Sequence, residues 1–337
     1  LPSAPPRLSG EPVALAGASM GTTWSARLAL PPGVTRQQAQ AAIAAALDEV
    51  VAQMSTWEAG SDISRFNRAA TGWQALPEAL FHVLSHALDL ADASGGAYDP
   101  TIGALVDAWG FGAGPRVHEP PAAAAIAAAL ADCGHGRVRL GAQARRAWQP
   151  GGVRLDAQAR RAWQPGGVRL DLSSIAKGYG VDRAALALRA LGVTACLVEV
   201  GGELRAHGVR PDGLPWRVAV EVPDASGAHA LAVPLRDQSI ATSGDYRRYI
   251  EQAGRRYAHT LAPRTGKPLD NDLASVTVIH PECMLADGLA TALGVLGAAA
   301  GADYAARHDL AALFILRGAA GHEVRATPAF AALLDRP

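Results

Sequence analysis

The chain has 337 residues, of which 49% are hydrophobic and 18% charged, a composition typical of folded globular proteins and not of disordered chains. The 31 basic and 31 acidic residues give a formal net charge of zero, which argues against bulk binding to nucleic acid or to an anionic membrane surface. No apolar run reaches the roughly 18 residues of a membrane span, so we expect none.

The N-terminal part predicts a flexible lead-in, a strand and a helix. Residues 1–12 are proline-rich, and the start at Leu1 fits either a removed leader or a shortened sequence. Residues 20–30 are rich in β-branched and aromatic side chains and predict a strand, which the PPG at 31–33 ends. Residues 35–54 predict a helix.

Two helices are expected next, each with a recognisable end. The segment SDISRFNRA at 61–69 predicts a short helix capped by Ser61 or Asp62. Residues 77–94 predict an amphipathic helix that ends at the glycine pair following it.

Asp99 directly precedes Pro100 within GAYDPTIGALVDAWGFG, residues 96–112. Aspartate at the N-cap and proline at the first helical position predict an ordinary helix start. On local grounds Asp99 therefore needs no functional role. An alanine-rich helix over 120–132 and a strand over 137–140 are expected to follow.

The block AQARRAWQPGGVRLD is written twice, so that residues 142–156 and 157–171 are identical. Each copy contains RRAWQ, PGG and VRLD, which predict a strand, a tight turn and a strand in one hairpin. The second copy keeps the natural continuation into the downstream chain. We therefore expect the first copy to be the extra one, looped out or lengthening the hairpin, without a chemical role. Two copies are too few for a solenoid, which needs about three.

The C-terminal half mixes strands and helices without the strict alternation of a parallel α/β fold. This predicts an α+β fold with a largely antiparallel sheet, in one continuous domain over residues 13–335. The expected helices are 181–191 and 282–296, and the expected strands are 168–172, 194–200, 204–209, 216–222, 231–236, 255–261 and 274–280.

The strongest local signal for chemistry lies in CMLADGLATALGVLG, residues 283–297. Asp287 and Thr291 are four residues apart, so on a helix they share a face opposite the leucines. Asp287 is the only charged residue between Cys283 and Gly301, and its neighbours are small. This setting suits a hard cation such as Mg²⁺, which takes oxygen ligands, although a plain solvated face is the alternative.

Three weaker signals occur elsewhere. In VRLDLSSIAKGYGVD, residues 168–182, a Ser- and Gly-rich loop with Lys177 leads into a helix and suits a phosphate, although the P-loop pattern is absent. His259 precedes a tight turn in YAHTLAPRTGKP, residues 257–268, but a lone histidine is more often structural. The glycines of GGE at 201–203 allow a close backbone approach.

Taken together, eight segments resemble the ApbE-type flavin transferases, also called FAD:protein FMN transferases. They occur in that family's order over about residues 17–318. Eight ordered matches are far more specific than any single motif. The segments are MGTTWS, MSTWEAGSDISRFN, GAYDPTIGALVDAWGFG, VRLDLSSIAKGYGVD, VEVGGELRAHG, IATSGDYRRY, HTLAPRTGKP and SVTVIHPECMLADGLATAL.

The resemblance implies an enzyme that binds FAD and Mg²⁺, moves FMN onto a threonine hydroxyl of an acceptor protein, and releases AMP. It implies metal ligands at Asp287, Thr291 and the backbone carbonyl of Ser174. Asp287 and Lys177 would be catalytic, and His259 is our candidate for accepting the hydroxyl proton, because imidazole titrates near neutrality. The implied flavin contacts are Met20, Trp57, Ala97, Tyr98, Asp99, Asp171, Lys177, His259, Thr260 and Leu261.

The resemblance also implies an architecture and a cellular setting. The fold would be an α+β, largely antiparallel, T-fold-like sheet with flanking helices, in a monomer or weak dimer that binds no nucleic acid. The acceptor would be a flavoprotein subunit of a membrane redox complex, of the Rnf type, the Na⁺-pumping quinone reductase type or the nitrous-oxide-reduction type. The expected localisation is periplasmic.

The sequence departs from the family pattern at a few positions, and two other functions stay open. Ala262 stands where the family often has Asp, while Gly180 and Gly288 replace a usual Ala. One alternative is a metal-dependent FAD pyrophosphatase that yields FMN and AMP. The other is a non-catalytic FAD-binding maturation factor, against which the retained Asp287, Thr291 and His259 argue.

Overall fold

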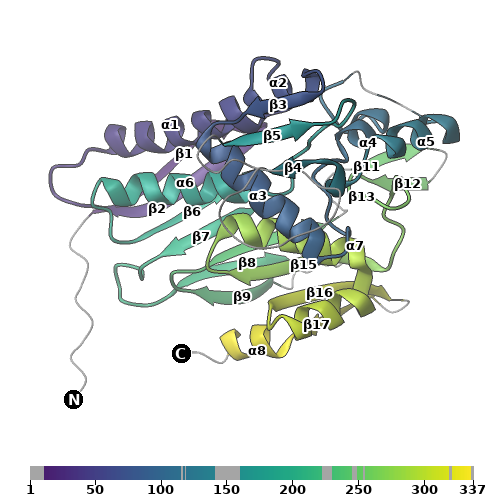
Figure 1. Ribbon diagram of the computed structural model, residues 1–337. Helices are drawn as coiled ribbons and strands as arrows, with labels where there is room; N and C mark the ends of the chain where they lie inside the picture. The colour runs from purple at the N-terminus through teal and green to yellow at the C-terminus, as the bar shows by residue number, and fades with distance from the viewer. Residues whose placement is uncertain are drawn as a thin grey trace. The chain divides into compact units, whose positions relative to one another are not determined.

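Figure 1 shows the computed structural model of the chain. The chain forms two compact units, each assembled from separated stretches of sequence. Because the stretches interleave, neither unit is a single segment of the chain, and the single domain predicted over residues 13–335 stays a prediction. The structure describes residues 11–114, 117, 119–140, 160–221, 230–244, 249–252, 255–318 and 321–334. Unit 1 comprises residues 1–49, 177–244 and 272–337, and unit 2 comprises residues 50–176 and 245–271.

Unit 1 is built on an eight-stranded sheet in which every neighbouring pair of strands is antiparallel. This confirms the predicted α+β class. The strand order is β1 (Glu11–Ser19), β2 (Thr22–Leu30), β6 (Cys196–Val200), β7 (Glu203–His207), β10 (Ser239–Gly244), β15 (Leu273–His280), β16 (Ala311–Gly318) and β17 (Gly321–Ala326).

Both faces of the sheet are covered, because successive side chains of a strand point to opposite faces. On one face, Cys196 and Val198 pack with apolar side chains of α1 (Arg36–Met54) and α6 (Ala176–Ala190). On the other face, Leu197 packs in a second cluster with a hairpin and a short helix. These are β8 (Trp216–Glu221), β9 (Ala230–Leu235) and α8 (Pro328–Leu334).

The helix α7 (Cys283–Arg307) packs on β10 and β15. Figure 1 shows α7 beside β15. Its backbone is interrupted at Gly297, which has a φ of 79° and marks a kink. By length and composition alone α7 could cross a membrane, but 56% of its apolar window is buried in the protein. Packing of this kind is expected for the central helix of a folded core.

Unit 2 holds shorter elements around an apolar core made by Leu105, Trp109, Ile126 and Leu261. Its helices are α2 (Asp62–Arg68), α3 (Glu78–Ala93), α4 (Gly103–Ala108), α5 (Ala123–Ala131) and the 3₁₀ turn η1 (His135–Arg137). A three-stranded sheet has the order β3 (Gly72–Ala75), β5 (Arg161–Gln164) and β4 (Arg139–Leu140). One hairpin pairs β11 (Tyr249–Gln252) with β12 (Arg255–Ala258). A second pairs β13 (Leu261–Ala262) with β14 (Lys267–Pro268).

The predicted hairpin in the doubled block is wrong for the second copy. The strand β5 pairs with β3 and β4, and residues 168–170 do not return alongside it. The Gln164 amide instead donates to the Val168 carbonyl at 2.9 Å, and the Leu170 backbone binds the Asn67 side chain. The side-chain amides of Gln164 and Asn67 thus bind the chain after the PGG turn, in place of a ladder of strand hydrogen bonds. The first copy, with residues 157–159, lies outside the described residues.

Candidate active site

The start of α6 lies against the first turn of α7, and a glycine makes this approach possible. A Cβ atom on Gly178 would collide with the Cys283 carbonyl oxygen and would lie 2.9 Å from Cβ of Asp287. Without that atom, the Gly178 backbone N–H donates to Asp287 Oδ2 at 3.0 Å. Gly178 therefore fixes one oxygen of the carboxylate that the sequence selects as a metal ligand.

Asp182 of α6 binds the N-terminus of α7. Its carboxylate accepts hydrogen bonds from the backbone N–H groups of Cys283 at 3.1 Å and Met284 at 2.9 Å, and it pairs with Arg205. The residue before α7, Glu282, makes no side-chain cap. Asp182 thus satisfies donors that every helix N-terminus leaves open.

Lys177 lies between two buried carboxylates of unit 1, in what we call the lysine cluster (Lys177, Glu203 and Asp287). Its Nζ atom is 2.5 Å from Glu203 Oε1 and 3.8 Å from Asp287 Oδ1. Burial lowers the pKa of Lys177, but the two carboxylates outweigh burial and the net pKa is raised. Burial raises the pKa of the Asp287 carboxyl, and the Lys177 ammonium opposes that change. The ammonium therefore stays charged beside Asp287.

Glu203 is a site residue that the sequence did not select beyond noting the GGE segment. Its side chain is 4% exposed, and its Oε2 atom has no hydrogen-bond partner among the described residues. Burial is the main reason why the pKa of Glu203 is raised, to about 7. A buried carboxylate oxygen without a partner is costly, so Oε2 is available to a ligand or a water.

Asp287 and Thr291 lie one turn apart on α7, as predicted. Over the described ranges, no group of three or more His, Cys, Asp or Glu residues could hold a metal ion. The donor set is instead one buried carboxylate and one hydroxyl. These two oxygen donors fit Mg²⁺, because this ion is commonly bound by few protein ligands and keeps several waters or phosphate oxygens as its other ligands.

Met20 occupies the two-residue turn between β1 and β2, where it has a φ of 53° and Gly21 a φ of 69°. Two successive positive φ values are typical of the type I′ turn of a hairpin. A Cβ atom on Gly180 of α6 would lie 2.9 Å from Met20 Sδ. The glycine that replaces the family's usual alanine thus leaves room for Met20.

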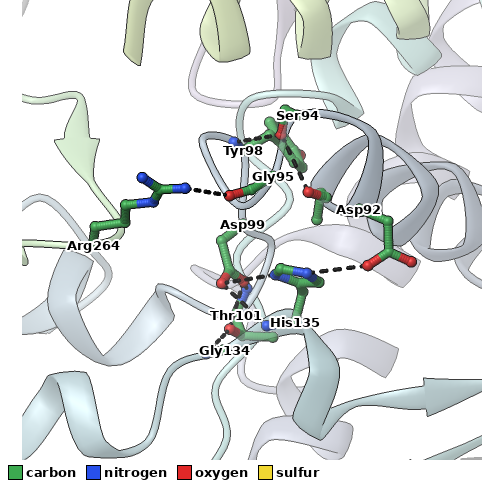
Figure 2. Close-up of polar contacts among 10 residues, drawn as sticks. Asp92, Ser94, Gly95, Tyr98, Asp99, Thr101, Gly134, His135 and Arg264 are labelled. Atoms are coloured by element: carbon green, nitrogen blue, oxygen red, sulfur yellow. Dashed lines mark hydrogen bonds and ion pairs between the residues drawn. The ribbon is translucent and has the colours of Figure 1, made fainter. Parts of the chain in front are cut away.

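The turn of Ala97, Tyr98 and Asp99 in unit 2 is buried, and its polar groups are paired (Figure 2). Asp99 Oδ1 accepts from the backbone N–H and the hydroxyl of Thr101, at 2.8 Å and 2.6 Å. The predicted helix start at Asp99 is therefore wrong, because α4 begins only at Gly103. The carboxylate closes a local turn instead of capping a helix.

The same turn reaches the loop that contains Asp171 and Ser174. The Asp171 backbone N–H donates to the Pro100 carbonyl at 2.8 Å, and Ser174 Oγ is 3.3 Å from the Tyr98 hydroxyl. Asp171 accepts from the Ser173 N–H at 2.7 Å, and burial raises the pKa of its carboxyl. Unit 2 thus brings together five of the residues that the resemblance selects, Ala97, Tyr98, Asp99, Asp171 and Ser174.

The other candidates in unit 2 occupy different settings. Trp57 lies on a loop and is 64% exposed, which leaves its indole accessible. His259 and Thr260 fall between β12 and β13, so the strand predicted over 255–261 is interrupted there. The His259 ring meets Phe111 edge-on with 6.5 Å between centroids, while Leu261 is buried in the core of the unit.

Comparisons with known proteins show the family of the chain. The model of the ApbE family matches residues 20–314. The FAD:protein FMN transferase of Haemophilus influenzae is 35% identical over 96% of this chain and 92% of its own length, and that of Vibrio cholerae is 36% identical over 97% and 94%.

Solved structures show the same fold. The flavin transferase ApbE from Vibrio cholerae has a TM-score of 0.86 at 34% identity and covers 96% of this chain and 100% of its own. The apo form of the Pseudomonas stutzeri flavinyl transferase ApbE has a TM-score of 0.84 at 36% identity, with 97% and 98% covered. The α+β fold is shared along nearly the whole chain, and this protein belongs to the ApbE family.

Proposed function

We propose that this protein transfers FMN from FAD to a threonine hydroxyl of an acceptor flavoprotein and releases AMP. Relatives with more than a third of their residues identical carry the name FAD:protein FMN transferase and match along almost the entire chain. The observation in the structure that carries the proposal is the lysine cluster. Asp287 is 5% exposed, yet it lies beside a charged Lys177 and next to the hydroxyl-bearing position Thr291.

Phosphoryl transfer depends mainly on positioning and on neutralising negative charge. Asp287 and Thr291 would hold Mg²⁺, which supplies positive charge at the pyrophosphate of FAD when bound. Lys177 adds a second positive charge, and Glu203 holds its ammonium in place at 2.5 Å. The carbonyl of Ser174 as a further metal ligand stays a prediction.

In the proposed reaction the threonine oxygen of the acceptor forms a bond to the phosphorus of the FMN half. The bond between that phosphorus and the oxygen leading to AMP breaks, and AMP leaves. The hydroxyl proton passes to His259, whose side chain is half-buried. Each bond formed is matched by one broken, so no oxidant or reductant is needed.

The flavin-binding residues are proposed on the resemblance and on their settings. The accessible indole of Trp57 suits stacking on an aromatic ring system. Met20, the Ala97–Asp99 turn, Asp171, Thr260 and Leu261 complete the proposed set. A redox-complex subunit as the acceptor and a periplasmic location stay predictions.

The test is a product analysis with the full chain, FAD, Mg²⁺ and a small acceptor domain that carries the target threonine. We expect the intact mass of the acceptor to rise by one FMN, with one AMP released per modified acceptor. AMP and free FMN without a mass increase would make the protein a pyrophosphatase. FAD binding without any AMP would make it a non-catalytic binder, and either result would reject the proposal.

A further inference from the structure

His135 of η1 lies between two aspartates of unit 2, in what we call the histidine bridge (Asp92, Asp99 and His135; Figure 2). Its Nε2 atom is 3.1 Å from Asp92 Oδ1, and its Nδ1 atom is 3.5 Å from Asp99 Oδ2. A neutral imidazole has one N–H donor, whereas an imidazolium has two. An acceptor on each side of the ring therefore selects the protonated form.

The bridge holds the turn that contains Tyr98 and Asp99. The His135 backbone N–H also donates to Asp99 Oδ2, at 3.1 Å, so one residue binds this oxygen twice. The Gly134 N–H donates to the Thr101 hydroxyl at 2.7 Å, and that hydroxyl donates to Asp99 Oδ1. Both carboxylate oxygens of Asp99 are thus tied, directly or through Thr101, to the segment at His135.

The imidazole also packs on the backbone at the start of the turn. A Cβ atom on Gly96, which has a φ of 81°, would lie 3.5 Å from His135 Cε1. On the same short segment, Arg264 donates to the Gly95 carbonyl at 2.9 Å. The segment from Gly95 to Asp99 is therefore held at its first residue by Arg264 and at its last by His135.

The charged groups around the ring favour its proton. The carboxylates that face it are Asp92 at the end of α3 and Asp99 in the turn. Among nearby cations, the Arg137 guanidinium binds the Ala131 carbonyl and lies 3.7 Å from Asp132, while Arg264 binds the Gly95 carbonyl. Both guanidiniums are occupied by other acceptors, so the two aspartates dominate the field at His135.

We propose that His135 is a positioning residue for FAD: as an imidazolium between Asp92 and Asp99, it holds the Ala97–Asp99 turn in the conformation that receives the substrate. The inference rests on the proposed function, which places that turn among the FAD contacts. Tyr98 links the turn to Ser174 through the 3.3 Å contact of their hydroxyl oxygens. Release of the bridge would therefore disturb a second part of the proposed binding set.

The stabilisation by the histidine bridge should decrease as the pH rises. The hydrogen bond to Asp99 raises the pKa of His135 above 6.5, burial opposes this, and the charges of Asp99 and Asp92 add to the increase. The stabilisation by the bridge is therefore complete below pH 6.5, and it is lost as the pH rises through the higher pKa of the folded protein. FAD binding should weaken over that same interval.

The experiment compares the wild-type chain with His135→Gln, which keeps one amide donor and cannot become a cation. We expect the KM for FAD to rise about threefold to fivefold at pH 6, the scale of a partly exposed ion pair, with kcat within about twofold of the wild type. The wild-type KM should climb towards that of the variant as the pH rises, while the KM of the variant stays nearly flat.

His207→Gln is the matched control, because it removes another histidine–aspartate pair, with His207 Nδ1 2.9 Å from Asp237 Oδ1. Hydrogen exchange of the peptide covering residues 95–101 gives a readout that does not depend on turnover. We expect faster exchange there in His135→Gln and none of these changes in His207→Gln. The same peptide should also exchange faster in the wild type as the pH rises, after correction for the intrinsic rate.

Unchanged exchange at residues 95–101 in His135→Gln would overturn the proposal, because the bridge would then not hold the turn. Faster exchange with an unchanged KM would also overturn it, since the turn would then not serve FAD. If the wild type transfers no FMN, the proposed function fails by itself. In that case equilibrium FAD binding of the two chains replaces KM: weaker binding by His135→Gln at pH 6 supports the positioning role, and equal binding rejects it.

Discussion

The lysine cluster of unit 1 and the histidine bridge of unit 2 each place one cation between two carboxylates, but they differ in burial and in the kind of cation. Glu203 and Asp287 expose only 4% and 7% of their side chains, whereas the bridge pairs a buried Asp99, at 7%, with Asp92, which exposes 64%. The pKa of Lys177 is raised from an already high value, so its charge persists. The pKa of His135 is raised from a starting value near neutrality, chiefly by its hydrogen bond to Asp99. Unit 1 thus carries a cation whose charge persists, and unit 2 carries one whose charge depends on pH.

Replacing Asp287 with Asn should have the largest effect, because it removes a charge that the lysine cluster cannot replace. We expect FMN transfer to fall by about a thousandfold, the scale of losing a principal electrostatic group. Thermal unfolding measured in parallel should show a folded protein, since the amide is nearly isosteric. A variant with wild-type transfer would remove Asp287 from the mechanism.

Gly178→Ala should have the second-largest effect, and it tests whether the lysine cluster depends on the close approach of α6 to α7. Gly178→Ala places a Cβ against the Cys283 carbonyl, a backbone atom that cannot move aside. Overpacking of this kind costs about 1–3 kcal/mol, and we expect transfer to fall by roughly a hundredfold as Asp287 shifts. Gly294→Ala on α7 is the control, because its new atom meets nothing nearer than Ser243 Oγ, at 3.9 Å. Equal losses in both variants would refute the steric argument.

Glu203→Gln should have a smaller and more specific effect. Without the Glu203 carboxylate, the Lys177 ammonium is left with Asp287 as its charged partner and competes with a metal there. We expect the Mg²⁺ concentration for half-maximal transfer to rise about tenfold, equivalent to about 1.4 kcal/mol, while the KM for FAD changes little. A magnesium titration of initial rates measures this. An unchanged magnesium requirement would show that Glu203 does not position Lys177.

The histidine bridge should give the smallest effect, visible in stability as well as in KM. Because the pKa of His135 is raised in the folded protein, the wild type should unfold at a higher temperature than His135→Gln at pH 6. We expect a difference of about 1–2 °C, which disappears as the pH rises through that pKa. A difference in unfolding temperature that grows as the pH rises would contradict the stabilising role of the protonated His135.

Most helices and strands can be predicted from the sequence, because the buried positions of each element carry mostly apolar residues. The strand over 20–30 and the helix over 35–54 appear as β2 and α1, and Ser61 caps α2 through a 3.2 Å bond from the Ser64 N–H. The strand β1 was not predicted, because its start lies in a proline-rich segment. The sequence also places the start of α6 five residues late, since glycines occupy its first turns.

The site is predicted only where its residues lie close together in the sequence. Asp287 and Thr291 share a helical spacing, so their pairing could be inferred. Glu203 lies 26 residues from Lys177, and His135 lies 36 residues from Asp99, so neither partner could be found by local spacing. The helix start wrongly predicted at Asp99 has the same origin. Its Asp–Pro pair matches a capping pattern, while the carboxylate is taken by Thr101 and His135.

The most direct test of the account is flavin fluorescence on the denatured acceptor band after incubation with FAD, comparing the wild-type chain with Asp287→Asn. We predict a fluorescent band for the wild type that disappears with a magnesium chelator, and a band at most about a thousandth as strong for the variant. A band of equal strength in both chains, or one that survives chelation, would contradict the role given to Asp287. Absence of a band from the wild type would contradict the transferase itself.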